Sequence, residues 1–429
     1  MVYTFSKLVL KHCLFAILFV SFLTGCSAPG PHQIVTSDRL VSDVQELCSP
    51  EFEGRETGTK GERAAGEWLA GRMHELGLIP AGDSLWFQHF TYTPHPPMQM
   101  HAMPDSSHQL GMALVQEIHG RNVLGALPGK TEQIGVLAAH YDHLGLGDEN
   151  SLFKGEPTIH YGADDNASGV ALILGIAEKW MAEGAHQNEL LLAGFSGEEK
   201  GLWGSNHFCK EPTIDLHHVK YMINLDMVGR LRGDTLAVYG TGTSPGWMDL
   251  LNDCNEDGLV LVPSESGVGP SDHTSFYLVD IPVLHFFTGQ HPDYHRPTDT
   301  ADKLNYEGML KVGSFIGRIM RRLDAEAEWP FTKTVDSDPS DTPDFKVTLG
   351  VVPDYLFSGS GMRIDGVSED RPAHHAGMKR GDIVTHLGDI EVTDMMSYMQ
   401  ALGAFAPGDQ CTAILIRKNE EIQTVVTWD

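Results

Sequence analysis

The stretch Phe195-Ser196-Gly197-Glu198-Glu199 directly follows the apolar run at 190–193. An uninterrupted apolar run of this kind predicts a fully buried strand, so the next residues lie where the chain leaves a sheet at its carboxyl edge. Ligands of open α/β sheets bind at that edge. Two adjacent acidic side chains on irregular backbone point in different directions, so Glu198 and Glu199 can serve one site only in different roles. A lone Glu-Glu pair most often lies on the solvated surface. It indicates a functional site only if other polar residues occur at the ends of neighbouring strands.

The same pattern, an apolar run followed by an acidic residue or a histidine, recurs along the chain. Further buried strands are predicted at 134–139, 219–225 and 281–287, and a helix follows residue 169. The polar side chains at the ends of these elements are His140, Asp142, Asp165, Asp226 and His295. Alternating strands and helices predict an α/β fold with a mostly parallel central sheet flanked by helices on both faces. Because the carboxyl ends of parallel strands meet at one edge, we expect these side chains to lie close together.

Composition excludes some classes of partner. The chain has 429 residues and a formal net charge of −28, from 58 acidic and 30 basic residues. This length suits roughly two to three domains with cores of their own. So acidic a protein is not expected to bind nucleic acid or anionic lipid headgroups through charge. Four cysteines, Cys48, Cys209, Cys254 and Cys411, would be left after processing at Cys26, and they allow three full pairings or free thiols.

The N-terminus predicts a lipoprotein signal peptide. Lys7 and Lys11 precede an apolar run at 14–20, which leads to Leu23-Thr24-Gly25-Cys26. A hydrophobic core of about ten residues suits a signal peptide, whereas a membrane span needs about twenty. Small residues before a cysteine resemble a bacterial lipobox, which implies lipid on Cys26. Ser27 then implies the Gram-negative outer membrane, facing the periplasm. Ordinary secretion or a short membrane anchor is the alternative.

Composition and periodicity divide the chain into five parts. These are a signal peptide (1–25), a tether (26–37), a main domain (38–330), a linker (331–344) and a small domain (345–429). The linker is acidic and rich in proline. The main domain begins with two predicted helices, at about 38–47 and 59–76, and a loop closed by glycines lies between them at 52–58.

Histidines and carboxylates without cysteine suit catalytic zinc better than structural zinc, which favours thiolates. The six side chains are His140, Asp165, Glu198, Glu199, Asp226 and His295. One zinc ion would use about three of them and leave the other acids unpaired. With two ions, Asp165 bridges and each ion takes one histidine and one further carboxylate. Glu198 then stays free as a general base, and Asp142 is placed to hold the second nitrogen of His140.

Five motifs occur in order within roughly residues 38–328. They are His140-Tyr141-Asp142, Asp165-Asn166-Ala167-Ser168-Gly169, Ser196-Gly197-Glu198-Glu199, Asn224-Leu225-Asp226-Met227 and Tyr294-His295-Arg296-Pro297-Thr298. They resemble the metallopeptidase family of the bacterial co-catalytic zinc aminopeptidases, aminopeptidase Y and glutamate carboxypeptidase. The resemblance implies two zinc ions, with His140 and Asp226 on one, Glu199 and His295 on the other, Asp165 bridging and Glu198 as the base. It also implies a cis peptide bond after Asp165.

Two features depart from the pattern of this family. Some members carry a tyrosine before the Ser-Asp-His motif that helps to hold the oxyanion, whereas Val268-Gly269-Pro270 precedes Ser271 here. Many relatives also insert a large domain before the His-x-Asp strand, and residues 86–120 are too few to form one.

An apolar substrate pocket is expected beside the metal ligands. Its candidates are Met227, Tyr277, Phe286 and Phe287, each of which suits core packing as well. Arg230 and Arg232 could instead recognise a substrate carboxylate. Neighbouring histidines such as His143 are expected to support a ligand or to pack in the core.

The small domain at 345–429 resembles a bacterial PDZ domain. The resemblance rests on Gly361-Met362-Arg363-Ile364-Asp365-Gly366-Val367, on 373–377 and on Gly381-Asp382-Ile383-Val384. It implies that an extended peptide adds a strand to the sheet, with its C-terminal carboxylate held by backbone N–H groups near 358–361. A domain that binds nothing is the alternative.

Together these features predict a lipid-anchored, two-zinc aminopeptidase that removes N-terminal, apolar residues from peptide substrates. A carboxypeptidase or dipeptidase on the same fold is the alternative. Glutaminyl cyclase is a less favoured activity, because those relatives work with one zinc ion. A metal-free peptide-binding adaptor would be expected to have lost ligands or the base, and none is missing here.

Overall fold

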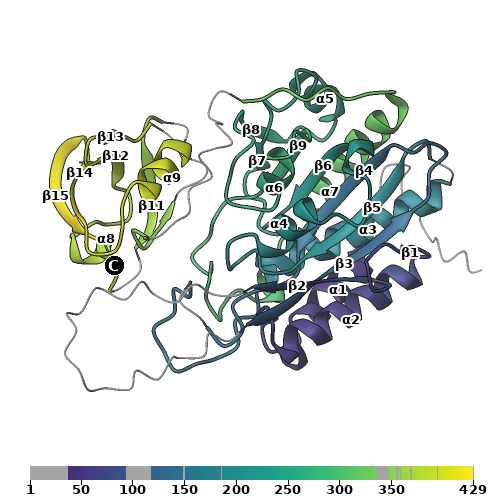
Figure 1. Cartoon of the computed structure of the whole chain (residues 1–429), viewed down its shortest axis with the longest axis horizontal. Coiled ribbons are helices and arrows are strands. Elements are labelled where there is room, and N and C mark those ends of the chain that lie inside the picture. Colours follow the sequence, from purple (N-terminus) through teal and green to yellow (C-terminus); the bar gives the residue numbers. More distant parts are fainter. Residues whose placement is uncertain are drawn as a thin grey trace, which may run out of the picture. The chain divides into compact units, whose positions relative to one another are not determined.

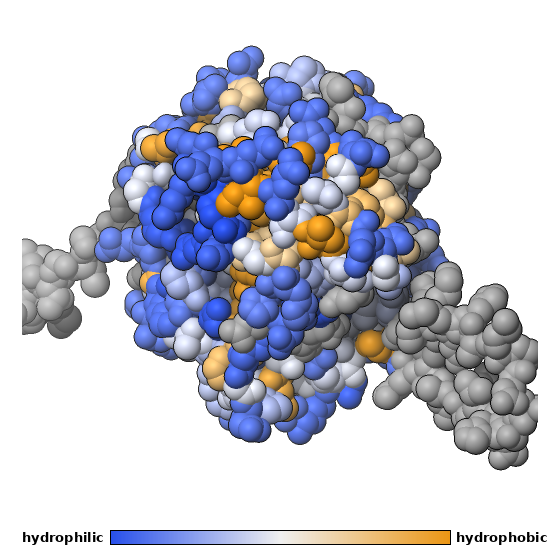
Figure 2. All heavy atoms as spheres, turned by 90° about the vertical axis from the view of Figure 1, so that its left-hand side faces the viewer, coloured by the Kyte–Doolittle hydropathy of each residue, from blue (hydrophilic) through white to orange (hydrophobic). Residues whose placement is uncertain are grey.

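In the computed structural model of the chain, the described residues are 37–92, 117–147, 150–184, 186–334, 347–353, 357, 359–367, 370–393 and 395–428. The predicted signal peptide, Cys26 and residues 26–36 of the predicted tether lie outside them, as do residues 335–344 of the predicted linker and the first two residues of the predicted small domain. Within the described part of the chain, no helix is both long enough and apolar enough to cross a membrane. The face drawn in Figure 2 is mostly hydrophilic, and its hydrophobic residues form small separate groups.

Two helices open the described chain, as predicted. They are α1 (Ser37–Leu47) and α2 (Lys60–Glu75), joined through a short 3₁₀ turn at Pro50–Phe52. The Thr59 side chain accepts a hydrogen bond from the Glu62 N–H and so caps the first turn of α2. Arg72 of α2 donates two hydrogen bonds of 2.9 Å to the Asp43 carboxylate, which joins the two helices.

A nine-stranded sheet forms the centre of the main domain (Figure 1). Its strands are β1 (Ile79–Pro80), β2 (Phe87–Tyr92), β3 (Ile118–Leu127), β4 (Ile134–His140), β5 (Glu189–Phe195), β6 (Val219–Leu225), β7 (Thr235–Tyr239), β8 (Val260–Ser264) and β9 (Val283–Phe287). The order is β1-β3-β5-β4-β6-β9-β7-β8, and β2 pairs with β3. Strands β5, β4, β6 and β9 are parallel, whereas β3 joins β5 and β7 joins β9 in antiparallel fashion. The sheet is therefore mixed, with a parallel centre instead of the mostly parallel sheet expected.

Strand β4 marks the point where the strand order reverses. The chain passes from β4 to β5 on one side and then returns to β6 on the other side. Ligands of open α/β sheets bind outside the carboxyl ends of the strands at such a reversal. The fold therefore places a candidate site beyond the ends of β4, β5 and β6.

Helices cover both faces of the sheet, as predicted (Figure 1). The larger core includes α1, α2, α3 (Gly169–Glu183), α5 (Trp247–Cys254) and α7 (Tyr306–Ala325), and the opposite core includes α4 (Trp203–Lys210) and α6 (His273–Tyr277). Along β4, neighbouring side chains face opposite cores: Leu137 faces the first and Val136 the second. Short turns of helix lie at Ala163–Ser168, Leu216–His218 and Ala301–Lys303.

The C-terminal residues form a small α+β domain of the predicted kind. Its six-stranded sheet contains β10 (Val351–Pro353), β11 (Met362–Val367), β12 (Ile383–Leu387), β13 (Ile390–Glu391), β14 (Gln410–Arg417) and β15 (Glu420–Thr427), accompanied by α8 (Pro372–His375) and α9 (Met395–Gly403). A separate hydrophobic core, which includes Ile364, Leu415 and Trp428, belongs to this domain.

Residues 331–334, which were expected to begin the linker, pack on the main domain. The Phe331 ring lies 5.6 Å from the Tyr277 ring, centroid to centroid, and the Thr334 hydroxyl is 2.9 Å from the Tyr277 hydroxyl. The main domain therefore extends beyond the predicted boundary at residue 330, because the Phe331 ring and the buried Thr334 hydroxyl pack against its core. All four cysteines left open by the sequence carry free thiols: Cys48, Cys209, Cys254 and Cys411.

Candidate metal centre

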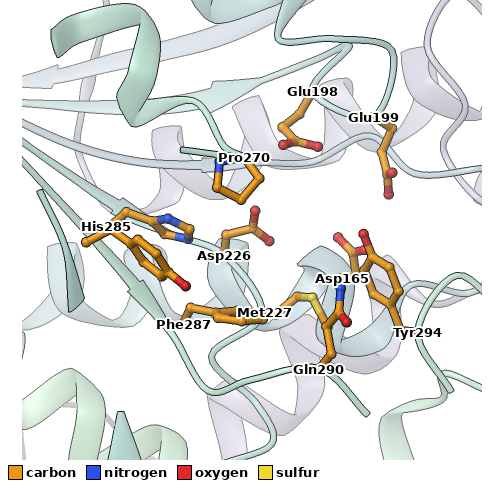
Figure 3. Close-up of a pocket in the computed structure, with 11 residues that line it drawn as sticks. Asp165, Glu198, Glu199, Asp226, Met227, Pro270, His285, Phe287, Gln290 and Tyr294 are labelled. Carbon is orange, nitrogen blue, oxygen red and sulfur yellow. The ribbon is translucent and has the colours of Figure 1, made fainter. Parts of the chain in front are cut away.

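The parallel strands deliver the candidate ligands to one edge of the sheet. His140 is the last residue of β4, Asp226 directly follows β6, and Glu198 and Glu199 follow β5. Gly197 has φ 78, a value that favours glycine, and it turns the chain from the end of β5 into the two glutamates. In Figure 3 the carboxylates of Glu198, Glu199 and Asp226 face a common space.

Asp165 reaches the same space from the turn that leads into α3. The peptide bond between Asp165 and Asn166 is cis, as the family resemblance implies. The Asp165 backbone N–H donates to Asp299, and the Asn166 side chain donates to the Leu225 carbonyl at 2.8 Å. The second of these hydrogen bonds attaches the turn to the end of β6, next to Asp226.

A first group of ligand atoms surrounds His140. Its Nε2 lies 3.2 Å from Asp226 Oδ1 and 3.3 Å from Asp165 Oδ1. Bonds of about 2.0–2.2 Å in tetrahedral zinc place neighbouring ligand atoms about 3.3–3.6 Å apart, close to these separations. The three residues are buried, and their ligand atoms lie within 4.8 Å of one another. The chemistry and the spacing of this group fit one zinc ion.

A second group uses the other oxygen of Asp165. His295 Nε2 lies 3.3 Å from Asp165 Oδ2 and 3.1 Å from Glu199 Oε2. The other nitrogen of His295, Nδ1, is 2.8 Å from the Asn150 carbonyl, to which it can donate, so that Nε2 keeps its lone pair. Nε2 is buried and has no hydrogen-bond partner among the described residues. These donors fit a second zinc ion, with Asp165 between the two.

Each outer carboxylate uses one oxygen for support and turns the other toward a histidine. Ser271 donates to Asp226 Oδ2 at 2.8 Å, which leaves Oδ1 to face His140. Glu199 Oε1 lies 2.6 Å from His143 Nδ1, which leaves Oε2 to face His295. Burial and Asp165 act to raise the Glu199 pKa, but His295 and His143 outweigh them and lower it to about 2.

His143 is closer to the centre than its sequence position indicated. One of its nitrogens lies within 4.8 Å of ligand atoms of Asp165 and Glu199, so His143 forms a candidate metal group with them, and His295 faces the same two carboxylates. The feature of the sequence that could have indicated a place for His143 at the metal centre is its position in the loop that directly follows His140. Its contact with Glu199 nevertheless joins two loops, and no spacing along the chain predicts such a contact.

Glu198 stands apart from both groups. Its Oε2 is 4.0 Å from His140 Nε2, and its backbone N–H donates to Asp142 Oδ1 at 3.3 Å. Burial raises the pKa of the Glu198 carboxyl well above its usual range; the positive charge of His140 opposes this and the charge of Asp226 adds to it. A raised pKa suits a carboxylate that must accept a proton and release it again near neutral pH.

Asp142 faces His140 without bonding to it. The distance from His140 Nδ1 to Asp142 Oδ1 is 3.6 Å, which exceeds hydrogen-bonding distance. The Asp142 carboxylate instead accepts from the Thr57 hydroxyl at 3.1 Å and from the Glu198 N–H. Asp142 is thus hydrogen-bonded to the loop that carries Glu198, whereas it only approaches the histidine that it was expected to hold.

A pocket opens beside the two groups. It is lined by Asp165, Glu198, Glu199, Asp226, Met227, Tyr239, Pro270, His285, Phe287, Gln290 and Tyr294 (Figure 3). Met227 and Phe287 therefore line it, as expected. Met227, Tyr239 and Phe287 pack together as a small apolar cluster, with Tyr294 against it. Tyr239 and Tyr294 are aromatic lining residues that the sequence did not single out.

Phe286 and Tyr277 do not lie in this pocket, contrary to expectation. Neighbouring side chains on a strand point to opposite faces, so Phe286 turns away from the face that Phe287 takes. The Phe286 ring packs edge-on against Phe315 of α7, with centroids 6.1 Å apart. Tyr277, 2% exposed, is part of the opposite core.

The two arginines considered for carboxylate recognition have other partners. Arg230 lies 3.1 Å from Asp293 and 3.3 Å from Asp299, and Arg232 donates to the Gln290 carbonyl at 2.6 Å. None of the described lining residues of the pocket is a lysine or an arginine.

Comparison with known proteins finds a family match within each domain. Residues 122–320 match Peptidase family M28, and residues 335–427 match the PDZ domain. A probable leucine aminopeptidase of Trichophyton verrucosum is 27% identical over 216 residues, which cover 47% of this chain and 55% of that protein. The chain thus spans about half the length of this curated relative.

Two solved structures share the fold of the main domain. A glutaminyl cyclase of Porphyromonas gingivalis has a TM-score of 0.54 at 18% identity, covering 68% of this chain and 99% of its own. BSAP, a zinc aminopeptidase from Bacillus subtilis, has a TM-score of 0.52 at 18% identity, covering 70% of this chain and 98% of its own. At this identity, the likeness shows a common fold.

Proposed function

We propose that this chain, which carries a peptidase family M28 domain followed by a PDZ domain, is a zinc-dependent aminopeptidase. One observation carries the proposal: four carboxylates line the pocket, and no lysine or arginine is among its described lining residues. With these carboxylates engaged by zinc ions, the described lining offers no cationic side chain to pair with the terminal carboxylate of a substrate, so the pocket favours a peptide that enters by its amino end. The curated relative, named a probable leucine aminopeptidase, supports this choice.

The residues divide the work of amide hydrolysis among them. We assign His140 and Asp226 to one zinc ion, Glu199 and His295 to the other, and Asp165 to both. Two zinc ions held by these residues would lower the pKa of a shared water and polarise the scissile carbonyl. Glu198 accepts the proton of the attacking water and passes it to the leaving amine. Asp142, which accepts the Glu198 N–H, helps to hold the general base in place.

A panel of chromogenic substrates tests this assignment. The full-length protein should hydrolyse leucyl amides, lose that activity when the substrate amine is acetylated, and lose it on treatment with a chelator. Hydrolysis of carboxy-terminal substrates alone would instead indicate the carboxypeptidase. Cyclisation of N-terminal glutamine without hydrolysis would indicate the activity named for the Porphyromonas gingivalis structure.

The apolar cluster of Met227, Tyr239 and Phe287 supports a preference for an apolar N-terminal residue. Phe287→Ala should lower kcat/KM for leucyl relative to alanyl amides by about 10-fold or more. The reason is that the leucyl side chain of the substrate loses an apolar contact with Phe287, which the shorter alanyl side chain makes to a smaller extent. Leu85→Ala, at a site 73% exposed, is the control. An unchanged leucyl-to-alanyl ratio in Phe287→Ala would remove Phe287 from the specificity pocket.

We further propose that the PDZ domain binds the C-termini of peptides and leaves the chemistry to the main domain. Support comes from its own hydrophobic core, separate from both cores of the main domain. Deletion of residues 345–429 should leave hydrolysis of leucyl amides largely intact and reduce turnover only of longer peptides that the domain recruits. An inactive truncated protein with normal zinc content would show that the domain takes part in catalysis.

We also propose lipid anchoring through Cys26, at the periplasmic face of the outer membrane. The support is the sequence at 23–27, a lipobox followed by serine. In a Gram-negative host, the wild-type protein should incorporate labelled palmitate and fractionate with outer membranes. Cys26→Ser should lose the label and leave that fraction. Release of wild-type protein into the soluble periplasm would contradict the anchor.

A further inference from the structure

The loop at 54–57, between α1 and α2, runs beneath the metal centre. It lies outside the segment at 122–320 that matches the peptidase family. Arg55 in this loop is only 1% exposed, although its side chain carries a positive charge. A buried charge is costly unless polar partners surround it, so the contacts of this guanidinium show what it is used for.

The Arg55 guanidinium binds four backbone carbonyls. Its Nε donates to Tyr141 at 2.8 Å, Nη1 donates to Leu47 at 2.6 Å and to Tyr161 at 2.9 Å, and Nη2 donates to Gly162 at 3.0 Å. No ion pair with a carboxylate is recorded for this side chain among the described residues. The charge is instead solvated by peptide dipoles that converge from three segments of chain.

Two of these segments carry metal ligands. Tyr141 lies between His140 and Asp142, and Gly162 directly precedes the turn that contains Asp165. His140 and Asp165 face each other across 3.3 Å in the first metal group. A single rigid side chain thus connects the backbones from which both residues project.

The rest of the loop makes further contacts with the same segments. The Arg55 carbonyl accepts the His143 N–H at 3.2 Å, and the Gly54 carbonyl accepts the Gly145 N–H at 3.0 Å. Thr57 donates to Asp142 Oδ2 at 3.1 Å. Gly54 has φ 75, and a side chain there would meet the backbone of Gly145 and His160. Only glycine allows this close approach.

We propose that residues 54–57 form a brace that positions the metal ligands, with Arg55 setting the separation of the His140 and Asp165 segments and Thr57 orienting Asp142. The brace acts through hydrogen bonds of Arg55 to backbone carbonyls and of Thr57 to Asp142, and neither residue is a candidate metal ligand. It rests on the proposed function in that zinc is the ion to be held. Residues that orient metal ligands typically contribute about 10- to 100-fold in metal affinity or activity.

Arg55→Lys is the decisive substitution. Lysine keeps the positive charge, but its ammonium group cannot reproduce the planar fork that reaches carbonyls in several directions. Zinc affinity of the full-length protein, measured by competition with a chromophoric chelator, should fall by about 10-fold or more. The visible absorption spectrum of the cobalt-substituted protein should also change, because it reports ligand geometry.

Arg72→Gln is the matched control for lost stability. Arg72 is also buried, at 6% exposed, and its recorded hydrogen bonds run to Asp43 and Glu75 in the helical layer. It should lower the melting temperature and leave zinc affinity and the cobalt spectrum unchanged. Thr57→Val, nearly isosteric, tests the brace without removing a buried charge, and it should alter the cobalt spectrum even if Arg55→Lys fails to fold.

The outcomes separate the two proposals. If the wild-type protein bound no zinc, the proposed function would fall and the brace with it. Suppose that the wild-type protein binds two zinc ions and that Arg55→Lys binds them with the same affinity and gives the same cobalt spectrum. Only the brace would then be overturned. If Arg55→Lys does not fold, the same comparison is made with Thr57→Val. A loss of zinc affinity in Arg72→Gln equal to that in Arg55→Lys would likewise reduce Arg55 to a general stabilising residue.

Discussion

Replacing Glu198 by glutamine is expected to lower kcat by about 10²- to 10⁴-fold and to leave zinc binding intact. The amide has the shape of the carboxylate but cannot accept the proton of the attacking water. Glu198 belongs to neither group of candidate ligands. Its Oε2 lies 4.0 Å from Nε2 of His140, a member of the first group. KM should change little, because the side chain is needed for the chemical step.

The neighbouring residue provides the contrast. Glu199→Gln removes the charge that faces His295 at 3.1 Å, so zinc content should fall along with activity. Metal analysis and steady-state kinetics on the two variants therefore distinguish a base from a ligand at adjacent positions. Near-normal turnover in Glu198→Gln would refute its role as the base, whatever the result for Glu199→Gln.

Replacing Asp165 by alanine is expected to release zinc from both positions and to abolish activity. Its Oδ1 faces His140 and its Oδ2 faces His295, each at 3.3 Å, so the substitution takes a ligand from each group. Zinc that binds only the folded state stabilises it by about 2.7 kcal/mol per site when free zinc is 100 times its Kd. This zinc-dependent stabilisation should largely vanish in Asp165→Ala.

The measurement is thermal unfolding of the main domain with zinc and with a chelator, together with metal analysis of the purified protein. Asp293→Asn is a suitable control, because Asp293 pairs with Arg230 and Lys303 and belongs to neither candidate metal group. It should keep the full response to zinc. Unchanged zinc content in Asp165→Ala would show that the bridging assignment is wrong.

The ends of the parallel strands made much of this site predictable. His140, Glu199 and Asp226 lie at or just beyond the ends of buried strands. Because parallel strands end at one edge, the proximity of these residues follows from the order of strands and helices alone. The mixed character of the sheet was harder to foresee. Strands β1, β2 and β3 add an antiparallel edge, and only their pairing in space shows it.

Contacts between distant segments explain the rest. His143 approaches Glu199, and Arg55 approaches Gly162, across loops whose relative positions no local pattern encodes. Phe286 and Phe287 were both reasonable pocket residues by composition. Strand alternation allows only one of them to face the pocket, and the choice depends on which face of β9 α7 covers.

The separate core of the C-terminal domain bears on how the protein melts. Because Leu415 and Trp428 belong to a core of their own, the C-terminal domain has the means to unfold as an independent cooperative unit. We expect a calorimetric trace of the whole chain to contain two heat-absorption peaks, of which zinc ions should move only the one that belongs to the main domain. A single melting midpoint would average the unfolding of the two domains. The effect of a substitution on stability must therefore be taken from the peak of the domain that carries it.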